Sequence, residues 1–145
     1  MMLSIRKFVQ GKDEAAWISV WNRAFREFEE FRDLTAEEML KWEKSPSFDV
    51  AGIFIAELEG KPVGIINAYV DKRREEKKGF INNFGVVPDY RRRGIGKALA
   101  ERAMVSFRER GMERVEASAA MDSIAAKRLG ERMGFTRVRV FSLMK

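Results

Sequence analysis

Hydrophobic residues recur along the chain at two spacings, and these spacings predict the order of its secondary structure elements. Apolar positions that alternate or run together predict strands at 4–9, 53–58, 62–70, 80–87, 115–119 and 135–143. Apolar positions three and four residues apart predict helices at 13–31, 35–42, 94–110 and 123–133. Three consecutive strands followed by alternating helices and strands indicate an α/β protein (α+β where its helices segregate), with helices on the faces of a mixed sheet.

Local signals indicate where several of these elements begin and end. Asp13 is placed to cap the first helix, and Thr35 with Glu38 forms a capping-box pattern at the second. Residues 59–61 read Glu-Gly-Lys, which predicts a hairpin turn, and Gly111 stands just after the third helix. The length of 145 residues is typical of a single domain, and the sequence has no internal repeat or low-complexity tract, so we expect one domain over residues 1–145.

The composition excludes several kinds of chemistry. The 145 residues include no His and no Cys, which excludes a Ser-His-Asp triad, a catalytic cysteine, disulfides and zinc sites built on these residues. We predict no metal. No stretch has the roughly 18 apolar residues of a membrane span, and the N-terminus lacks the apolar core of a signal peptide. We expect a cytoplasmic protein that binds no membrane, and 34% charged residues without Cys favour a thermostable one.

The net charge of +6 is divided unevenly between the two parts of the chain. Residues 1–60 carry 8 Lys and Arg against 12 Asp and Glu, and residues 61–145 carry 20 against 10. This asymmetry favours an anionic partner for the second part or a cationic one for the first, although a solvated charged surface has the same composition. A nucleic-acid binder needs a continuous basic stripe with exposed aromatic residues, whereas this sequence concentrates positive charge in one loop.

That basic loop is the most informative segment of the sequence. After a strand that ends before Pro88, the chain reads Arg-Arg-Arg-Gly-Ile-Gly-Lys over residues 91–97 and then enters a helix. The first turn of a helix leaves backbone N–H groups unpaired and carries partial positive charge, and glycines let an anion approach them. The segment predicts a phosphate or pyrophosphate site, with a solvated strand-to-helix turn as the alternative. It lacks the Walker A ending and the spacing of the dinucleotide fingerprint.

The same region resembles the GNAT N-acetyltransferases. Val86-Val87-Pro88 followed by residues 91–96 is similar to the family's acetyl-CoA loop, and Met133-Gly134-Phe135 is similar to its later Gly-Phe signature. The specific motifs lie within 80–135, and the element order agrees along the whole chain. The resemblance implies a GNAT fold, which is a mixed, mostly antiparallel central sheet of six or seven strands flanked by about four helices.

The resemblance also implies how acetyl-CoA, the cosubstrate, is bound. Backbone amides of the loop are expected to hold the pyrophosphate; the loop consists of Arg91, Arg92, Arg93, Gly94, Ile95, Gly96 and Lys97. The strand backbone at Phe84, Gly85 and Val86 is expected to pair with pantetheine, and the N–H of Gly85 is expected to polarise the thioester carbonyl. Ser123 and Lys127 would contact the cofactor from the following helix.

Two positions depart from the family's pattern. The Tyr that often protonates the leaving thiolate falls on Gly130, and the position often held by a Glu base falls on Asn82. Water can carry the proton while Asn82 orients a water or substrate group, or Tyr69 or Tyr90 can supply the missing group. A third possibility is a non-catalytic acyl-CoA-binding or sensor module. Packing in the sheet is the alternative role for Tyr69, and satisfying the backbone at a β-bulge is the alternative for Asn82.

The segment between Trp17 and Trp42 is where the family usually builds its acceptor site. It holds an acidic cluster that is either a solvated face or an attraction for a cationic amine, and its members are Glu27, Glu29, Glu30, Asp33, Glu37 and Glu38. The resemblance therefore predicts an N-acetyltransferase in which an amine of a small molecule or peptide attacks acetyl-CoA directly in a ternary complex. The short last strand could also pair across a homodimer.

Overall fold

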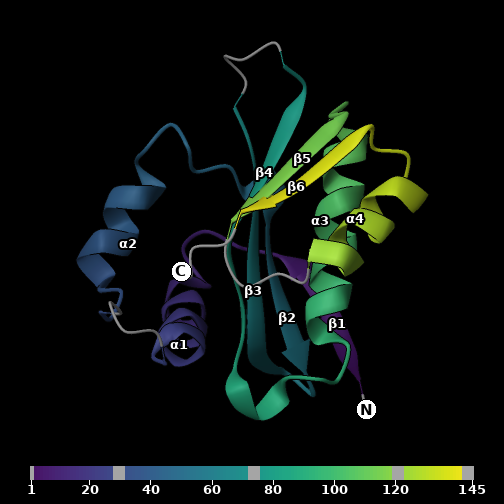
Figure 1. Cartoon of the computed structure of the whole chain (residues 1–145). Coiled ribbons are helices and arrows are strands. Elements are labelled where there is room, and N and C mark those ends of the chain that lie inside the picture. The colour runs from purple at the N-terminus through teal and green to yellow at the C-terminus, as the bar shows by residue number, and fades with distance from the viewer. Residues whose placement is uncertain (1, 28–31, 72–75, 119–122, 142–145) are drawn as a thin grey trace.

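The computed structural model describes residues 2–27, 32–71, 76–118 and 123–141. Within these ranges, the order of the elements is the predicted one (Figure 1). The strands are β1 (Leu3–Lys7), β2 (Ile53–Leu58), β3 (Lys61–Val70), β4 (Lys78–Val86), β5 (Arg114–Ser118) and β6 (Arg137–Phe141). The helices are α1 (Glu14–Phe25), α2 (Ala36–Glu43), α3 (Ile95–Glu109) and α4 (Ser123–Arg132), with 3₁₀ turns at Val50–Gly52 and Pro88–Tyr90.

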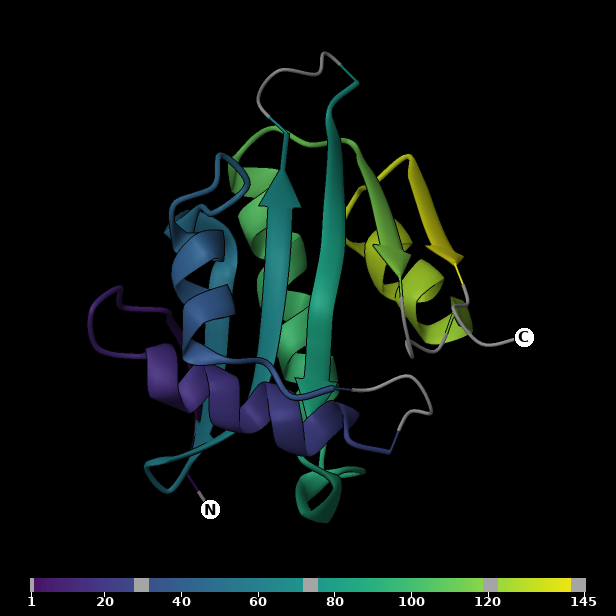
Figure 2. The same ribbon diagram turned by 90° about the vertical axis from the view of Figure 1, so that its left-hand side faces the viewer.

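The six described strands form one mixed sheet in the order in which they occur in the chain (Figure 2). Neighbouring strands from β1 to β4 are antiparallel, whereas the pairs β4–β5 and β5–β6 are parallel. A parallel pair needs a crossover connection, and α3 and α4 lie in the two crossovers. The predicted mixed, mostly antiparallel sheet of an α/β protein is confirmed.

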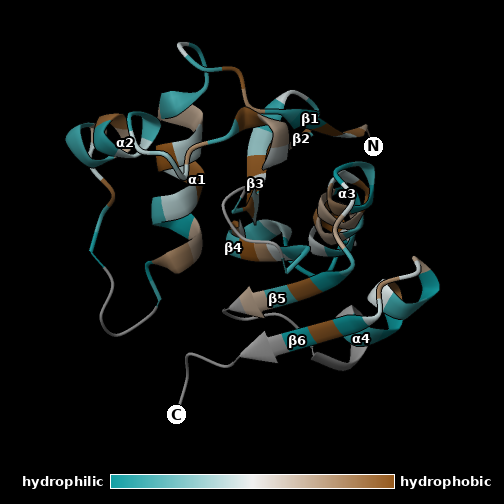
Figure 3. Cartoon of the chain, turned by 90° about the horizontal axis from the view of Figure 1, so that it is seen from above, coloured by the Kyte–Doolittle hydropathy of each residue, from teal (hydrophilic) through white to brown (hydrophobic). Residues whose placement is uncertain are grey.

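Helices lie on both faces of the sheet (Figure 3). One face packs on α3 and α4 through a large apolar cluster in which Phe54 and Leu99 are fully buried. The other face packs on α1 and α2, where Trp17 and Ile65 are buried. Burial of one such large side chain contributes about 1.5–3 kcal/mol, so these two clusters hold the helices on the sheet. No helix of the described residues is long and apolar enough to cross a membrane.

The predicted caps of the first two helices have different outcomes. Thr35 and Glu38 form the predicted capping box, since the Glu38 N–H donates to Thr35 Oγ1 at 3.1 Å and the Thr35 N–H donates to Glu38 Oε1 at 3.2 Å. Asp13 is the N-cap residue of α1, but its side chain makes no cap bond. Arg6 instead binds both carboxylate oxygens at 2.7 and 2.9 Å, and the Val9 N–H donates to the same group at 2.7 Å.

The first helix also ends earlier than its periodicity predicts, at Phe25 rather than near residue 31. Asn22 supplies the reason: its Oδ1 accepts a hydrogen bond from the Leu34 N–H at 2.7 Å, and its Nδ2 donates to the Leu34 carbonyl at 3.4 Å. These bonds hold the returning chain beside α1, which a longer helix would not allow. Residues 28–31 lie outside the described ranges.

The other boundaries lie within two residues of their predicted places, apart from those that fall on residues 119 and 142–145, which are not described. The last strand begins at Arg137 rather than at residue 135. Phe135 belongs to the preceding turn, where its N–H donates to the Gly130 carbonyl at 3.0 Å and its side chain joins the core.

Candidate active site

β4 and β5 are parallel neighbours that separate partway along their length. Their register joins residues 78–81 of β4 to residues 114–117 of β5. Beyond this point β4 continues to Val86, and β3 is the neighbour with which it pairs among the described residues. The open edge of β4, residues 82–86, therefore offers backbone groups to an extended ligand, as sheet edges do. The predicted site residues Phe84, Gly85 and Val86 lie on this edge.

A β-bulge in β4 sets the direction of the residues on the open edge. Asn82 is opposite Asn67 of β3 and Gly85 is opposite Ile65, so β4 carries one extra residue between them. Asn83, inside the bulge, has a φ of +50°. Because side chains alternate between faces, the extra residue places Asn82 and Gly85 on the same face, the one that α1 covers.

The C-terminal end of α1 packs directly on this part of β4. A Cβ atom at Gly85 would lie 2.9 Å from the Cβ of Ala24 and 3.0 Å from Cζ of Phe25. Only glycine lets the helix approach the strand so closely. The last turn of α1 is thereby held beside the bulge and the open edge.

β4 leads through the 3₁₀ turn at 88–90 into the basic loop and the N-terminus of α3. Gly94 is the N-cap residue, in the left-handed conformation with a φ of +82°, and the Ala98 N–H makes the first bond of the helix, to the Gly94 carbonyl at 3.0 Å. Within the described ranges, none of the N–H groups of residues 92–97 donates a hydrogen bond. These amides and the dipole of α3 supply the donors and the partial positive charge that the predicted anion site needs, and the binding itself stays a prediction.

Side chains around these amides leave the helix N-terminus accessible. Arg92, Arg93 and Lys97 are exposed, and the Arg93 guanidinium lies 5.2 Å from the centre of the Tyr90 ring. Ile95 is buried in the core and anchors the first turn of α3. A Cβ at Gly96 would be 3.6 Å from Phe84 Cζ, so the fold itself tolerates a side chain there and the glycine keeps the helix N-terminus open.

Arg91 differs from the other loop residues, because the protein uses its hydrogen-bonding groups internally. Its N–H donates to the Pro88 carbonyl at 3.3 Å. Its guanidinium donates to the carbonyls of Val86 and Ala24, both at 2.9 Å, and to the carboxylate of Glu27. Arg91 therefore joins β4 to the end of α1. The sequence did not reveal this role, since three consecutive arginines look equivalent in it.

The two predicted contacts from the helix after β5 are described unequally. Lys127 is an exposed residue of α4. Ser123 is the first residue of α4, and its side chain lies outside the described part of the structure. Both roles stay predictions.

Two of the candidate groups for proton handling, and the position that lacks the family's tyrosine, lie in different environments. The Tyr69 ring packs on Phe80 with centroids 6.1 Å apart, which fits the packing role considered for it. Asn82 Oδ1 is buried and has no hydrogen-bond partner within the described ranges. A Cβ at Gly130 would lie 2.1 Å from Val138 Cγ2, so α4 has no room for a side chain at the family's tyrosine position. Asn82 is the polar group left without a partner beside the bulge.

The acidic cluster of the N-terminal part is largely paired with neighbouring arginines. Glu27 binds Arg91, and Asp33 lies 3.4 Å from Arg26. Glu38 caps α2 and lies 2.8 Å from Arg32. Glu29 and Glu30 lie outside the described ranges. The described part of the cluster therefore carries little net negative charge to attract a cationic acceptor.

An open strand edge that leads to free amides at a helix N-terminus suits a ligand with an extended arm and a phosphate group. The comparisons with known proteins agree. The model of the acetyltransferase (GNAT) family matches residues 15–135, and the chain belongs to this family. The predicted family is thereby confirmed.

Relatives and solved structures extend this result. The chain is 36% identical over 136 residues to a mycothiol acetyltransferase of Thermobispora bispora, covering 92% of this chain and 46% of the relative. It spans about half the length of the curated relatives it matches.

Two solved structures show the same fold. One is the ribosomal-protein-S18-alanine N-acetyltransferase from Escherichia coli, with 22% identity, a TM-score of 0.65 and coverage of 92% of this chain and 77% of that one. The other is a GNAT family acetyltransferase from Brucella melitensis in complex with acetyl-CoA, with 21% identity, a TM-score of 0.64 and coverage of 79% and 73%. The predicted GNAT fold is confirmed.

Proposed function

We propose that residues 1–145 form an N-acetyltransferase domain in which an amine attacks acetyl-CoA directly within a ternary complex. The observation that carries the proposal is the open edge of β4, which ends at the unbonded amides of residues 92–97. The mycothiol acetyltransferase relatives support an amine acceptor in a small molecule, although this chain spans about half of their length. A peptide amine is equally compatible with the open site.

The residues of the loop and of β4 divide the binding of the cosubstrate between them. We assign the pyrophosphate to the amides of residues 92–97, with Arg92, Arg93 and Lys97 supplying positive charge around them. We assign the pantetheine arm to the backbone of Phe84–Val86, which pairs with it as an added strand would. Lys127 is a further candidate for a phosphate contact. Arg91 acts as a positioning residue, because its bonds hold α1 beside the loop.

The chemical step requires a stabilised oxyanion and a route for the amine proton. The acceptor nitrogen forms a bond to the thioester carbonyl carbon, the C–S bond breaks, the amine loses a proton and the thiolate gains one. The Val87 N–H donates to the Val63 carbonyl at 2.9 Å, and N–H directions alternate along an antiparallel strand, so the Gly85 N–H points to β3 and those of Phe84 and Val86 point to the open edge. We therefore take the Phe84 N–H, in place of that of Gly85, as the candidate donor to the developing oxyanion, a contribution of about 3–4 kcal/mol when such a donor is preorganised. Asn82 Oδ1, buried and unpartnered beside it, would accept a hydrogen bond from the attacking amine or from a water that takes up its proton.

Binding and turnover test this proposal separately. Isothermal titration should show saturable, micromolar binding of CoA and acetyl-CoA, and no binding would overturn it. Release of CoA thiol, followed with a thiol reagent over a panel of amines, should exceed hydrolysis in buffer. The Asn82→Ala variant should lower kcat about tenfold while CoA affinity is kept.

A non-catalytic acyl-CoA-binding module is the second candidate. The tight packing of Gly130 against Val138 favours it, because the family's tyrosine cannot be accommodated there. This module would bind CoA in the titration but would show no transfer to any amine of the panel.

A further inference from the structure

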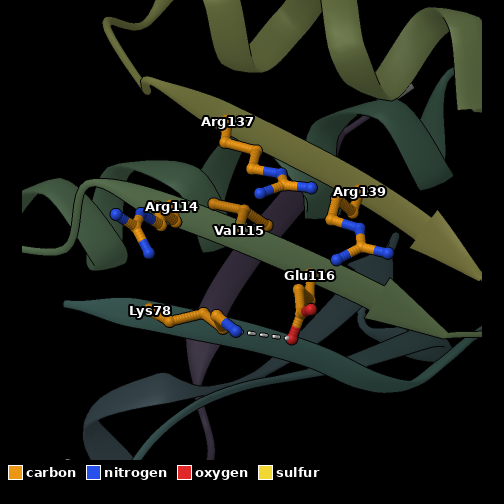
Figure 4. Close-up of a pocket in the computed structure, with 6 residues that line it drawn as sticks. All are labelled: Lys78, Arg114, Val115, Glu116, Arg137 and Arg139. Carbon is orange, nitrogen blue, oxygen red and sulfur yellow. Dashed lines mark ion pairs between the residues drawn. The ribbon is translucent and has the colours of Figure 1, made fainter. Parts of the chain in front are cut away.

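The surface of β4, β5 and β6 that faces away from α3 and α4 carries a groove of charged side chains (Figure 4). We call it the basic groove. Its lining residues are Lys78, Arg114, Val115, Glu116, Arg137 and Arg139. Four cationic side chains thus line the groove with one carboxylate, and a second carboxylate, Glu76, lies beside Lys78. This excess of positive charge fits an anionic group.

The period of the strands explains why these side chains gather. Val115 of β5 and Val138 of β6 are buried in the cluster under α3 and α4. Their neighbours in the sequence therefore point to the opposite face of the sheet. On that face α1 and α2 do not cover β5 and β6 (Figure 3). The parallel register places Arg114 beside Arg137 and Glu116 beside Arg139, which brings the charges of both strands together.

The single carboxylate of the basic groove is already engaged. Lys78 Nζ lies 3.4 Å from Glu116 and 3.4 Å from Glu76, and the Lys78 and Glu116 side chains are only 19% and 15% exposed. Arg114 and Arg137 are exposed residues of the same surface. An anion that enters the groove would therefore meet arginines at its mouth rather than the carboxylate.

The basic groove and the candidate active site lie on the same face of β4. Lys78 and Asn82 are four residues apart, before the bulge, so both side chains point to one face. At about 3.3 Å per strand residue, their separation along the strand is about 13 Å. An extended peptide has the same rise. A peptide with its terminal amine at Asn82 would bring its fourth or fifth residue to the groove.

On the basis of the proposed function, we propose that the basic groove binds an anionic group of the acceptor, a carboxylate about four residues from the reacting amine of a peptide. Acceptors with Asp or Glu at positions 4 and 5 would be favoured over those with Lys. The acceptor preference then comes from the positive second part of the chain, while three described members of the acidic cluster, Glu27, Asp33 and Glu38, are engaged in ion pairs.

The test compares hexapeptides with a free N-terminus and Glu, Ala or Lys at positions 4 and 5. Binding is followed by fluorescence anisotropy with a C-terminal label, which needs no turnover, and kcat/KM is measured with acetyl-CoA. We expect the Glu peptide to bind about tenfold more tightly than the Ala peptide, with a preference that weakens at high salt. In the Arg137→Glu/Arg139→Glu double variant, the ratio of Glu to Ala peptide affinity should fall to about one or below.

The matched control is Arg108→Glu/Arg132→Glu, which changes the net charge equally at exposed residues of α3 and α4. It should keep the preference, and Arg137→Lys/Arg139→Lys should retain most of it. Equal affinities for the three peptides, or equal loss in the control, would overturn the proposal. Binding of a single-stranded RNA through Arg137 and Arg139 without binding of the Glu peptide would also overturn it. If the Glu peptide binds through the groove but is not acetylated, the proposed function fails and the groove assignment stands.

Discussion

At the scale of single residues, the loop arginines show how neighbours in a motif take different roles. Arg91 donates hydrogen bonds to β4, to α1 and to Glu27, whereas Arg92 and Arg93 are exposed beside the free amides. A sequence pattern predicts positive charge for all three. Which side chain turns inward depends on the path of the loop and on the position of α1, which lies far away in the sequence.

Replacing Arg91 with Ala should lower both stability and cofactor affinity. The variant loses bonds to the carbonyls of Val86 and Ala24 and to Glu27, so we expect the free energy of unfolding to fall by about 2 kcal/mol. CoA affinity should fall about tenfold, because the loop is no longer held to α1. Urea denaturation and titration calorimetry measure the two effects. The exposed control Arg93→Ala should change stability by less than about 0.5 kcal/mol; equal unfolding free energies for both variants would contradict the role of Arg91.

The close packing of Gly130 against Val138 leads to a second prediction at the scale of single residues. Replacing a helical Gly with Ala normally stabilises by up to about 1 kcal/mol. Here the new Cβ would lie 2.1 Å from Val138 Cγ2, so Gly130→Ala should instead destabilise by about 1–2 kcal/mol. Gly130→Tyr should cost more and should not raise the rate of transfer. Denaturation of Gly130→Ala with and without Val138→Ala measures the clash, and a stability loss that Val138→Ala does not relieve would contradict it.

At the scale of elements, local sequence signals correctly predicted the features that depend on residues close together in the sequence. The capping box at Thr35 and Glu38 and the strand Ile53–Leu58 are present as predicted. The end of α1 and the side-chain bonds of Asp13 differ, because Asn22 binds Leu34 and Arg6 binds Asp13 from outside the helix that each residue belongs to. Contacts between distant segments leave no periodic signal in the sequence, so such details need the structure.

The N-terminus of α3 offers a test in which stability and binding change in opposite directions. A Cβ at Gly96 would make only ordinary contacts, at 3.6 Å from Phe84 and 3.8 Å from Val86. Gly96→Ala should therefore stabilise the protein by about 0.5 kcal/mol through helix propensity. The added methyl group covers the amides of the first turn, so CoA affinity should fall about tenfold. Thermal unfolding and calorimetry on the same preparation check both effects. Unchanged CoA affinity would contradict the assignment of the pyrophosphate to the N-terminus of α3.

At the scale of the whole molecule, the sequence predicts a cofactor side of the site more directly than an acceptor side. The loop at 91–97 is contiguous, so its residue types alone predict an anion site. The basic groove joins residues near 78, 114 and 137, which only the parallel order of β4, β5 and β6 brings together. The bulge at Asn83, which sets the faces of Asn82 and Gly85, likewise depends on pairing with β3.

The packing of α1 against α2 brings together two carboxyl groups, Glu14 and Glu43, whose pKa values shift in opposite directions. Burial, followed by the hydrogen bond and the charge of Glu14, raises the pKa of Glu43 to about 7. For Glu14, burial acts in the same direction, but hydrogen bonds from Glu43 and from the Gly11 N–H outweigh it, so its pKa lies below the usual value. We therefore expect the pair to share one proton, as one carboxylate and one protonated carboxyl.

This shared proton makes the stability of the fold depend on pH. Because the pKa of Glu43 is higher in the folded state, its contribution is complete below about pH 4.5 and is lost as pH rises through about 7. Both side chains are partly exposed, so water screening limits the loss to about 1 kcal/mol between pH 5 and pH 8. The Glu43→Gln side chain can still donate a hydrogen bond to Glu14 but does not titrate. This variant should therefore lose this part of the change in the free energy of unfolding between the two pH values, as measured by urea denaturation. The exposed control Glu37→Gln, on the same helix, should retain it, and equal slopes in the two variants would show that Glu14 and Glu43 do not share a proton.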